Sequence, residues 1–172
     1  MRSERTTSLK HRSKQHRAVE YFSFAGLKTH MAPTGLHLYG VNYLEAAKIV
    51  PMVNDRFAPA RYLLICHSIE LLLKAFLSIN GRSLEELAAK FGHDLWRLLL
   101  VANEHGLTSL VTLEPYQLDQ IELASEYYAE NVFEYPAIEE SLRAYPRTPQ
   151  IKPLIEAAEL LAAALEKPCL AC

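Results

Sequence analysis

Apolar residues recur at steps of three and four from about residue 36 onward, and no segment alternates convincingly with a period of two. This pattern predicts α-helices and no strands. The predicted helices span residues 38–50, 58–80, 83–91, 94–105, 112–130 and 149–166, with one short helix near Glu139. Because four to five of them are main helices joined by short connections, the sequence predicts an all-α, antiparallel up-and-down bundle in one domain.

Residues typical of helix ends mark the boundaries between these segments. Ser83 is followed three residues later by Glu86, which is typical of a capping box, and Asp94 can cap the next helix. Gly106 is expected to end that helix, and Pro168 is expected to end the last one. These signals predict short turns between the helices.

Composition divides the chain into a basic leader and a mildly acidic domain. The 172 residues carry a formal net charge of -2, and 50% are hydrophobic, which excludes a collagen-like or wholly disordered protein. Residues 1–17 hold six Lys or Arg against one acid, so the rest of the chain carries -7. We expect residues 1–30 to form a disordered leader, 31–168 the bundle and 169–172 a C-terminal tail. Met31 is an alternative translation start.

Hydropathy and cysteine content predict the compartment. No apolar run approaches the roughly 18 residues that a membrane span requires, so we expect a soluble protein that binds no membrane. Three cysteines fit the reducing cytoplasm, with Cys66 in an apolar run as a core residue. Cys169 and Cys172 end the chain. A redox pair, half a zinc site and a prenylation box are the functional alternatives for them, and an incidental tail is the simpler interpretation.

The predicted helix over residues 58–80 carries the most informative polar side chains. It is apolar almost all round, which predicts burial among other helices. At about 100° per residue, its main polar side chains share a stripe about 80° wide: His67, Glu70, Lys74 and Ser78. Glu70 and Lys74 also have the spacing of an ion pair. Either the stripe is a satisfied polar network that fixes the register of the bundle, or it lines a cleft and engages a substrate or partner.

A second polar feature is the turn Gly92-His93-Asp94-Leu95. A turn and a helix cap explain Gly92 and Asp94, but neither requires His93. His93 can help to bind an anion at the helix N-terminus, or it can hydrogen-bond to Glu70 and close the polar network. We favour the second interpretation.

Three segments together resemble the HEPN superfamily: Tyr43-Leu44-Glu45-Ala46-Ala47, the run Cys66-His67-Ser68-Ile69-Glu70-Leu71-Leu72-Leu73-Lys74-Ala75-Phe76-Leu77, and Gly92-His93-Asp94-Leu95. The resemblance covers residues 38–106 well and extends loosely to 166. It implies an up-and-down helical bundle that forms a homodimer. Many members are metal-independent ribonucleases of toxin–antitoxin or other defence systems, and others are non-catalytic RNA-binding or interaction domains.

Catalytic members of that superfamily carry an Arg followed four to six residues later by a His, and Arg61 with His67 fits this spacing. The resemblance then implies attack of a 2′-hydroxyl on the adjacent phosphate, with His67 as general base or acid and Arg61 stabilising the phosphorane charge. A regular helix places Arg61 about 120° from His67, so a kink or a second subunit is needed to join them. No cofactor is expected, and no cluster of carboxylates or His and Cys suggests a metal.

The sequence is compatible with three functions. The first is an RNA-binding or metal-independent ribonuclease effector of a toxin–antitoxin or defence-type system, with an antitoxin or a nucleotidyltransferase as partner. The second is a non-catalytic HEPN-like interaction module in which the stripe of His67, Glu70 and Lys74 is structural. The third is an unrelated helical adaptor that binds a protein. The charge of -7 argues against a broad nucleic-acid-binding surface on the bundle.

Overall fold

The computed structural model describes residues 25–51, 58–135 and 147–171, with side chains from residue 33 onward. Within these ranges the chain forms six α-helices, one short 3-10 helix and no strand. The all-α fold class predicted from the apolar periodicity is therefore confirmed. The short helix expected near Glu139 lies outside the described residues.

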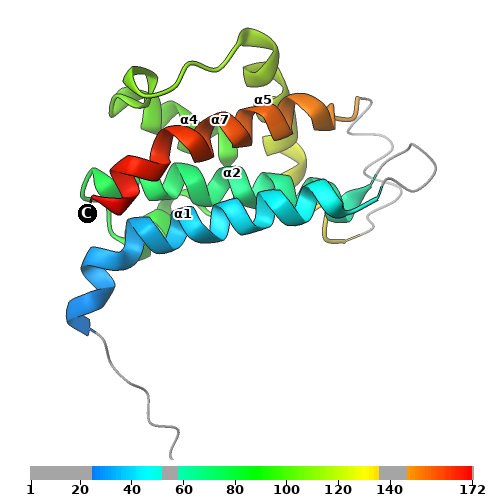
Figure 1. The fold of residues 1–172 in the computed structure, drawn as a ribbon. Coiled ribbons are helices and arrows are strands. Elements are labelled where there is room, and N and C mark those ends of the chain that lie inside the picture. The colour runs from blue at the N-terminus through cyan, green and yellow to red at the C-terminus, as the bar shows by residue number, and fades with distance from the viewer. Residues whose placement is uncertain (1–24, 52–57, 136–146, 172) are drawn as a thin grey trace, which may run out of the picture.

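One central helix contacts all the other α-helices. The elements are α1 (Ala25–Ile49), α2 (Pro59–Ile79), α3 (Leu84–Phe91), α4 (Leu95–Glu104), η1 (Leu107–Ser109), α5 (Pro115–Ala129) and α7 (Ile151–Leu170). α2 contacts α1, α3, α4, α5 and α7, and α1 also contacts α7. Figure 1 shows α1 running opposite to both α2 and α7. The bundle is thus built around α2.

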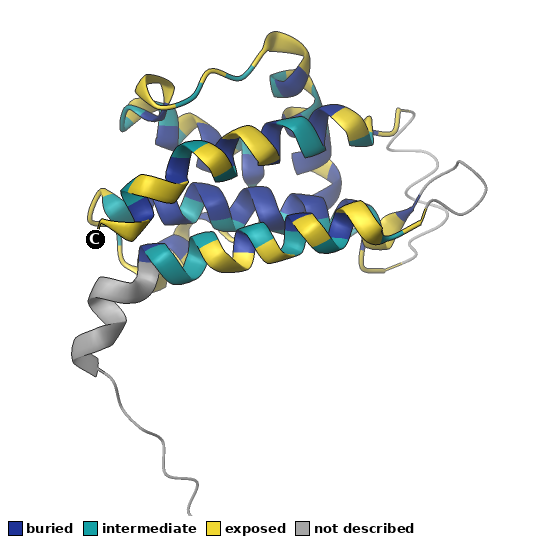
Figure 2. Cartoon of the chain, in the orientation of Figure 1, coloured by how far each residue is buried: buried dark blue, intermediate teal, exposed yellow. Residues whose placement is uncertain are grey.

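α2 forms the core because it is apolar on nearly every side. Ile65, Leu72 and Leu73 are fully buried, and Figure 2 shows α2 in dark blue along most of its length. By length and composition α2 is apolar enough to cross a membrane, which differs from the expectation that no segment approaches such a span. However, 67% of its apolar 18-residue window is buried inside the bundle. Such burial is typical of the core helix of a soluble protein.

Local capping sets most of the helix boundaries, as the sequence predicts. The Ser83 side chain accepts a hydrogen bond from the Glu86 amide, which starts α3. Asp94 Oδ1 accepts from the Arg97 amide at 3.0 Å, which starts α4. Gly106 follows α4 with a φ of 92°, in the left-handed region that glycine adopts without strain.

Two prolines lie inside helices, and both change a predicted boundary. α1 begins at Ala25, not at residue 38, so its first residues lie in the segment expected to be the leader. The helix then continues through Pro33 to Ile49. α7 continues through Pro168 to Leu170, so the prediction that Pro168 ends this helix is wrong. Pro168 lies in the last turn, where it removes only one helical hydrogen bond. The fully buried Cys169 and the bond from Thr34 Oγ1 to its carbonyl oxygen hold this last turn on α1.

α1 packs closely against α2 at Gly40. A Cβ atom at this position would lie 2.9 Å from Leu72 Cγ and 3.3 Å from the Ser68 carbonyl oxygen. Ser68 Oγ in turn donates a 2.7 Å hydrogen bond to the Gly40 carbonyl. This contact fixes the position of α2 against α1 next to His67 and Glu70, the polar residues of α2.

Candidate functional site

A buried carboxylate lies at the centre of the polar residues of α2. The Glu70 side chain is only 3% exposed, although it is charged. Four other residues are hydrogen-bonded to it directly or through one neighbour, and we call the set the Glu70 network: His67, Glu70, Lys74, His93 and Tyr128. The network joins α2 to the turn between α3 and α4 and to α5.

Both oxygen atoms of Glu70 accept hydrogen bonds. Oε2 accepts from the Tyr128 hydroxyl at 2.7 Å and from His93 Nδ1 at 3.0 Å. Oε1 accepts from Lys74 Nζ, which also donates to the Gly92 carbonyl at 3.0 Å. The contact between His93 and Glu70 is the one expected from a closed polar network. Lys74 therefore fastens the same turn that carries His93.

The hydrogen-bond pattern assigns the tautomers of both histidines. The single Tyr128 hydroxyl proton goes to Glu70, so the Tyr128 oxygen must accept from His67 Nδ1, which lies 2.8 Å away. The ionised Glu70 carboxylate is only an acceptor, so His93 Nδ1 also carries a proton. In their neutral forms both rings then have a bare Nε2. The side chains of His67 and His93 are 30% and 44% exposed.

Burial and hydrogen bonding act in opposite directions on Glu70. Burial alone raises its pKa, but the polar contacts with His67, Lys74 and His93 outweigh burial and lower the pKa from 4.5 to about 2. Tyr128 shows the reverse effect, because burial and then the Glu70 charge raise the pKa of its hydroxyl. Glu70 is thus ionised and Tyr128 is a fixed donor at neutral pH.

One aromatic ring packs against each of the two histidines. Tyr43 of α1 meets the His67 ring edge to face, with centroids 4.6 Å apart. Tyr128 meets the His93 ring in the same way at 5.0 Å. Such contacts restrict the rotation of each imidazole. The rings are therefore held by packing as well as by hydrogen bonds.

The two remaining residues predicted to bind or to join the network lie outside it. Asp94 Oδ1 caps α4 and accepts a 3.3 Å hydrogen bond from Ser125 Oγ of α5. Ser125 Oγ also accepts from the Trp96 amide at 3.0 Å. Asp94 thus ties α4 to α5 beside the network. Ser78 is half-buried near the end of α2, and the hydrogen bonds of the Glu70 network described here do not reach it.

Arg61 and His67, the predicted catalytic pair, have different neighbours. Arg61 lines a pocket with residues of α7, among them Ile151 and Glu156. Its Nε atom is buried without a hydrogen-bond partner among the described residues. His67 instead contacts Tyr128 of α5 and Tyr43 of α1. The described contacts of one chain do not bring these two side chains together.

Nothing in the described part of the chain resembles a metal centre. No group of three or more His, Cys, Asp or Glu side chains converges there. Cys66 is buried in α2, where burial and then the Glu70 charge raise the pKa of its thiol. Cys169 is buried in α7, and Cys172 lies outside the described residues. A buried thiol with a raised pKa is a poor nucleophile and a poor ligand.

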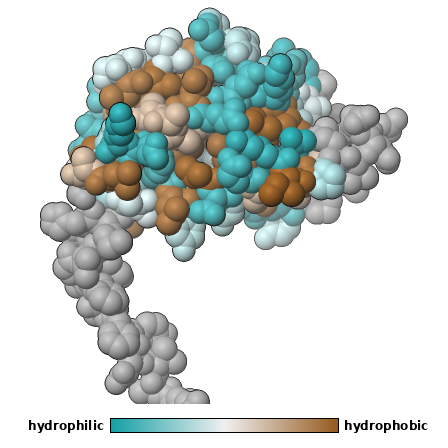
Figure 3. All heavy atoms as spheres, viewed as in Figure 1, coloured by the Kyte–Doolittle hydropathy of each residue, from teal (hydrophilic) through white to brown (hydrophobic). Residues whose placement is uncertain are grey.

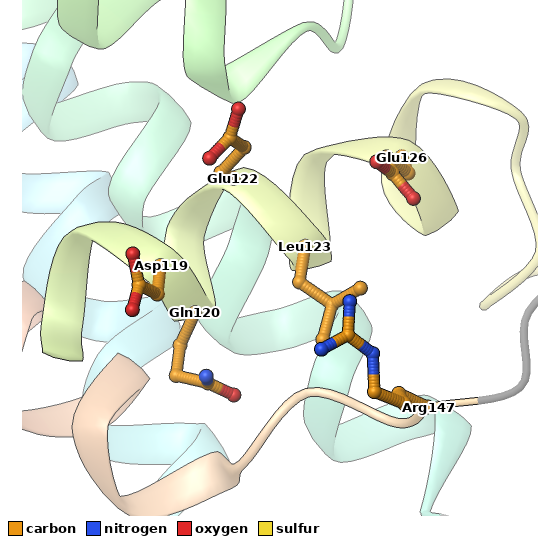
Figure 4. Close-up of a pocket in the computed structure, with 6 residues that line it drawn as sticks. All are labelled: Asp119, Gln120, Glu122, Leu123, Glu126 and Arg147. Atoms are coloured by element: carbon orange, nitrogen blue, oxygen red, sulfur yellow. The ribbon is translucent and has the colours of Figure 1, made fainter.

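A separate surface pocket of about 340 Å³ lies along α5. Figure 4 shows its lining residues: Asp119, Gln120, Glu122, Leu123, Glu126 and Arg147. Three carboxylates and one guanidinium line this pocket, so the local charge is negative and disfavours an anion such as phosphate. Arg147 therefore does not form an anion site in this pocket.

Tyr128 is the network residue that the sequence analysis missed. It lies 58 positions after Glu70, and no local pattern distinguishes it from its neighbour Tyr127. A buried tyrosine requires a partner for its hydroxyl, and this requirement is the only signal that the sequence contains. The fold and the site define an all-α bundle that encloses a hydrogen-bonded carboxylate. No protein-family model, no curated protein and no solved structure matches the chain.

Proposed function

We propose that this protein is a non-catalytic, HEPN-like interaction module in which the Glu70 network is structural. The observation that carries the proposal is that the buried carboxylate accepts three hydrogen bonds from three parts of the bundle. Both oxygens of Glu70 are hydrogen-bonded, and their donors come from α2, from the turn before α4 and from α5. A carboxylate that is held in this way joins three parts of the bundle, and the three donors that it binds are all protein groups.

The energetics of buried charges support a structural role. Removing one partner of a buried ion pair costs about 3–5 kcal/mol, because the remaining charge is left without compensation. Lys74 is 11% exposed and its other hydrogen bond goes to the Gly92 carbonyl, so it depends on Glu70 for its counter-charge. The network thus specifies how the α3–α4 turn docks on α2.

A comparison of Glu70→Ala with Glu85→Ala tests the structural role. Glu85 is an exposed carboxylate in the first turn of α3, so it serves as the matched control. We expect Glu70→Ala to lower the melting temperature by several degrees or more, and Glu85→Ala to change it little. The wild-type protein should leave total RNA intact in the presence of EDTA. Equal melting temperatures for the two variants would contradict a structural network.

A second candidate function is a metal-independent ribonuclease, and the two bare Nε2 atoms favour it. In that reaction one histidine takes the proton of the 2′-hydroxyl at its bare Nε2 as the oxygen attacks the phosphorus. The other histidine has first to take up a proton from solvent at Nε2, which it then gives to the departing 5′ oxygen. The products are a 2′,3′-cyclic phosphate and a free 5′-hydroxyl. His67 and His93 have the exposure that these roles require, and the bare Nε2 of either ring suits the base. Arg61 would act only from a second subunit.

Cleavage of total RNA by purified protein in EDTA distinguishes the second candidate. If the ribonuclease function holds, His67→Ala and His93→Ala each lower the rate by about 100-fold or more. His105→Ala is the control, because His105 caps the end of α4 outside the Glu70 network. Activity that survives both His67→Ala and His93→Ala excludes these residues as the catalysts.

The remaining features of the proposal come from the resemblance and from composition. The module is a cytoplasmic homodimer, and its partner is an antitoxin, a nucleotidyltransferase or RNA. The charge of -7 outside residues 1–17 favours a protein partner over RNA. An adjacent nucleotidyltransferase gene would support a toxin–antitoxin pair.

A further inference from the structure

We infer that a groove between α1 and α7 is the docking site for an amphipathic helix with basic edges, supplied by another protein. This inference rests on the proposed interaction module and names the class of its partner. The groove has a volume of about 510 Å³. We call it the α1–α7 groove, and its apolar lining residues are Leu38, Val41, Leu44, Ala162, Ala163 and Leu170.

The lining of the α1–α7 groove leaves apolar surface open to solvent. Leu38 is 57% exposed and Leu170 is 66% exposed, while Leu44 closes the floor at 2%. Single exposed leucines are ordinary, but apolar side chains gathered in a groove mark a binding surface. Figure 3 shows apolar residues in brown among hydrophilic ones in teal on the face that carries α1 and α7.

Polar contacts between α1 and α7 keep the groove in shape without a ligand. His37 Nε2 donates to the Ala162 carbonyl at 2.8 Å, and Thr34 Oγ1 donates to the Cys169 carbonyl at 2.6 Å. Lys48 pairs with a carboxylate of α7, Glu159, at 2.7 Å. A preformed groove lowers the entropic cost of binding a helix.

Charge complementarity selects the partner. The rim carries three carboxylates, Glu45, Glu159 and Glu166, against one ammonium, Lys48. Lys48 pairs with Glu45 at 2.8 Å as well as with Glu159. Its charge offsets one of the three carboxylates, so the rim keeps a net charge of -2. The groove therefore combines an apolar floor with an acidic rim. A helix with a leucine-rich face flanked by Lys or Arg is complementary to both.

The same rim disfavours two other occupants. In a two-fold dimer through this face, the acidic rim of one copy would meet the acidic rim of the other. RNA would bring its phosphates against the same carboxylates. The groove therefore fits neither a second copy of the chain nor a nucleic acid.

Fluorescence anisotropy of the full-length protein with a labelled model peptide tests the inference. The peptide has about 18 residues of Leu and Lys, with Leu at helical spacing, and a matched peptide carries Glu in place of Lys. We expect the Lys peptide to bind more weakly as salt rises and the Glu peptide not to bind. Leu38→Gln and Glu166→Lys should each weaken binding about tenfold.

Two substitutions on α4 are the matched controls. Leu100 is 45% exposed and Glu104 is exposed, and neither lines the groove. We expect Leu100→Gln and Glu104→Lys to change the affinity for the Lys peptide by less than about twofold. Equal weakening by groove and control variants overturns the inference, because the peptide would then bind through overall charge alone.

Two further measurements test whether a second copy of the chain or the chain's own N-terminal segment occupies the α1–α7 groove. If Leu38→Gln dissociates a dimer in sedimentation, a second copy occupies the groove and the inference is wrong. If charge reversal at Arg12, Lys14 and Arg17 strengthens peptide binding, the chain's own N-terminal segment occupies it, and the inference is also wrong. RNA cleavage by the wild-type protein would contradict the proposed function, whereas the peptide result depends only on the groove.

Discussion

At the scale of single residues, Glu70 determines what its neighbours can do. Its charge makes Tyr128 a donor, and Tyr128 in turn makes His67 Nδ1 a donor. Each proton position in the network thus follows from one ionised carboxylate. Substitution of Glu70 should therefore change the stability of the fold and also the dependence of that stability on pH.

Acid should destabilise the wild-type protein through Glu70. Its pKa is about 2 in the folded protein and near 4.5 when unpaired. Because the folded value is the lower one, the stabilisation is complete above about pH 5 and is lost as the pH falls toward 2. The loss amounts to at most about 3 kcal/mol. Urea denaturation at several pH values should show a smaller loss for Glu70→Gln. Parallel pH profiles would contradict the assignment.

Removal of the Tyr128 hydroxyl tests the hydrogen bonds that link His67 to Glu70. Tyr128→Phe takes a hydrogen bond from Glu70 and leaves His67 Nδ1 without its acceptor, so we expect a loss of about 1.5–3 kcal/mol in unfolding free energy. Tyr116 also donates to a carboxylate, Glu156, but on the exposed surface. Tyr116→Phe should therefore cost less than about 0.5 kcal/mol. Comparable losses in the two variants would be inconsistent with a buried network.

The residues of the network differ in how far the sequence could predict them. Glu70 and Lys74 are one helical turn apart, so their pairing follows from the geometry of a single helix. The sequence allows two interpretations of His93, because its contact with Glu70 requires the turn between α3 and α4 to fold back onto α2. The contact of Tyr128 with Glu70 could not be predicted, since the sequence of α5 does not determine which of its faces packs against the core.

At the scale of helices, local signals explain most boundaries and tertiary packing explains the exceptions. Ser83 and Asp94 cap their helices through contacts within one turn, so the sequence alone could reveal them. Pro33 and Pro168 carry a local signal to stop, yet α1 and α7 continue through them. The two helices contact α2 and each other, and this packing outweighs one missing hydrogen bond.

The crossing of α1 and α2 should be sensitive to a single methyl group. Gly40→Ala would place a Cβ 2.9 Å from Leu72 Cγ, so we expect a loss of about 1–3 kcal/mol in unfolding free energy. Gly35 lies in the same helix, and a Cβ there meets nothing within 4 Å. Gly35→Ala should be neutral or should stabilise by up to about 1 kcal/mol. Chemical denaturation of both variants measures the difference, and equal stability would rule out the close crossing.

At the scale of the whole molecule, buried charges and surface charges are arranged differently. The Glu70 network neutralises its charges inside the bundle, whereas the α1–α7 groove leaves its carboxylates at the rim. The sign of the total charge follows from composition, but this arrangement does not, because surface neighbours come from helices far apart in the chain. Fold class could thus be predicted, and the groove could not.

Sedimentation should give the mass of a dimer, twice 19.5 kDa, as the resemblance implies. We expect Leu38→Gln to leave this mass unchanged, because like charges keep two α1–α7 grooves apart. A monomer at all accessible concentrations would argue against the dimer, without bearing on the Glu70 network.

The position of Glu70 also constrains the order in which the chain folds. Lys74 is on the same helix, but His93 and Tyr128 arrive from 23 and 58 residues away. If α2 were buried before both arrived, Glu70 would lose its water with too few donors to replace it. The docking of the α3–α4 turn and the docking of α5 are therefore coupled events, and an intermediate with only one of them in place is unfavourable.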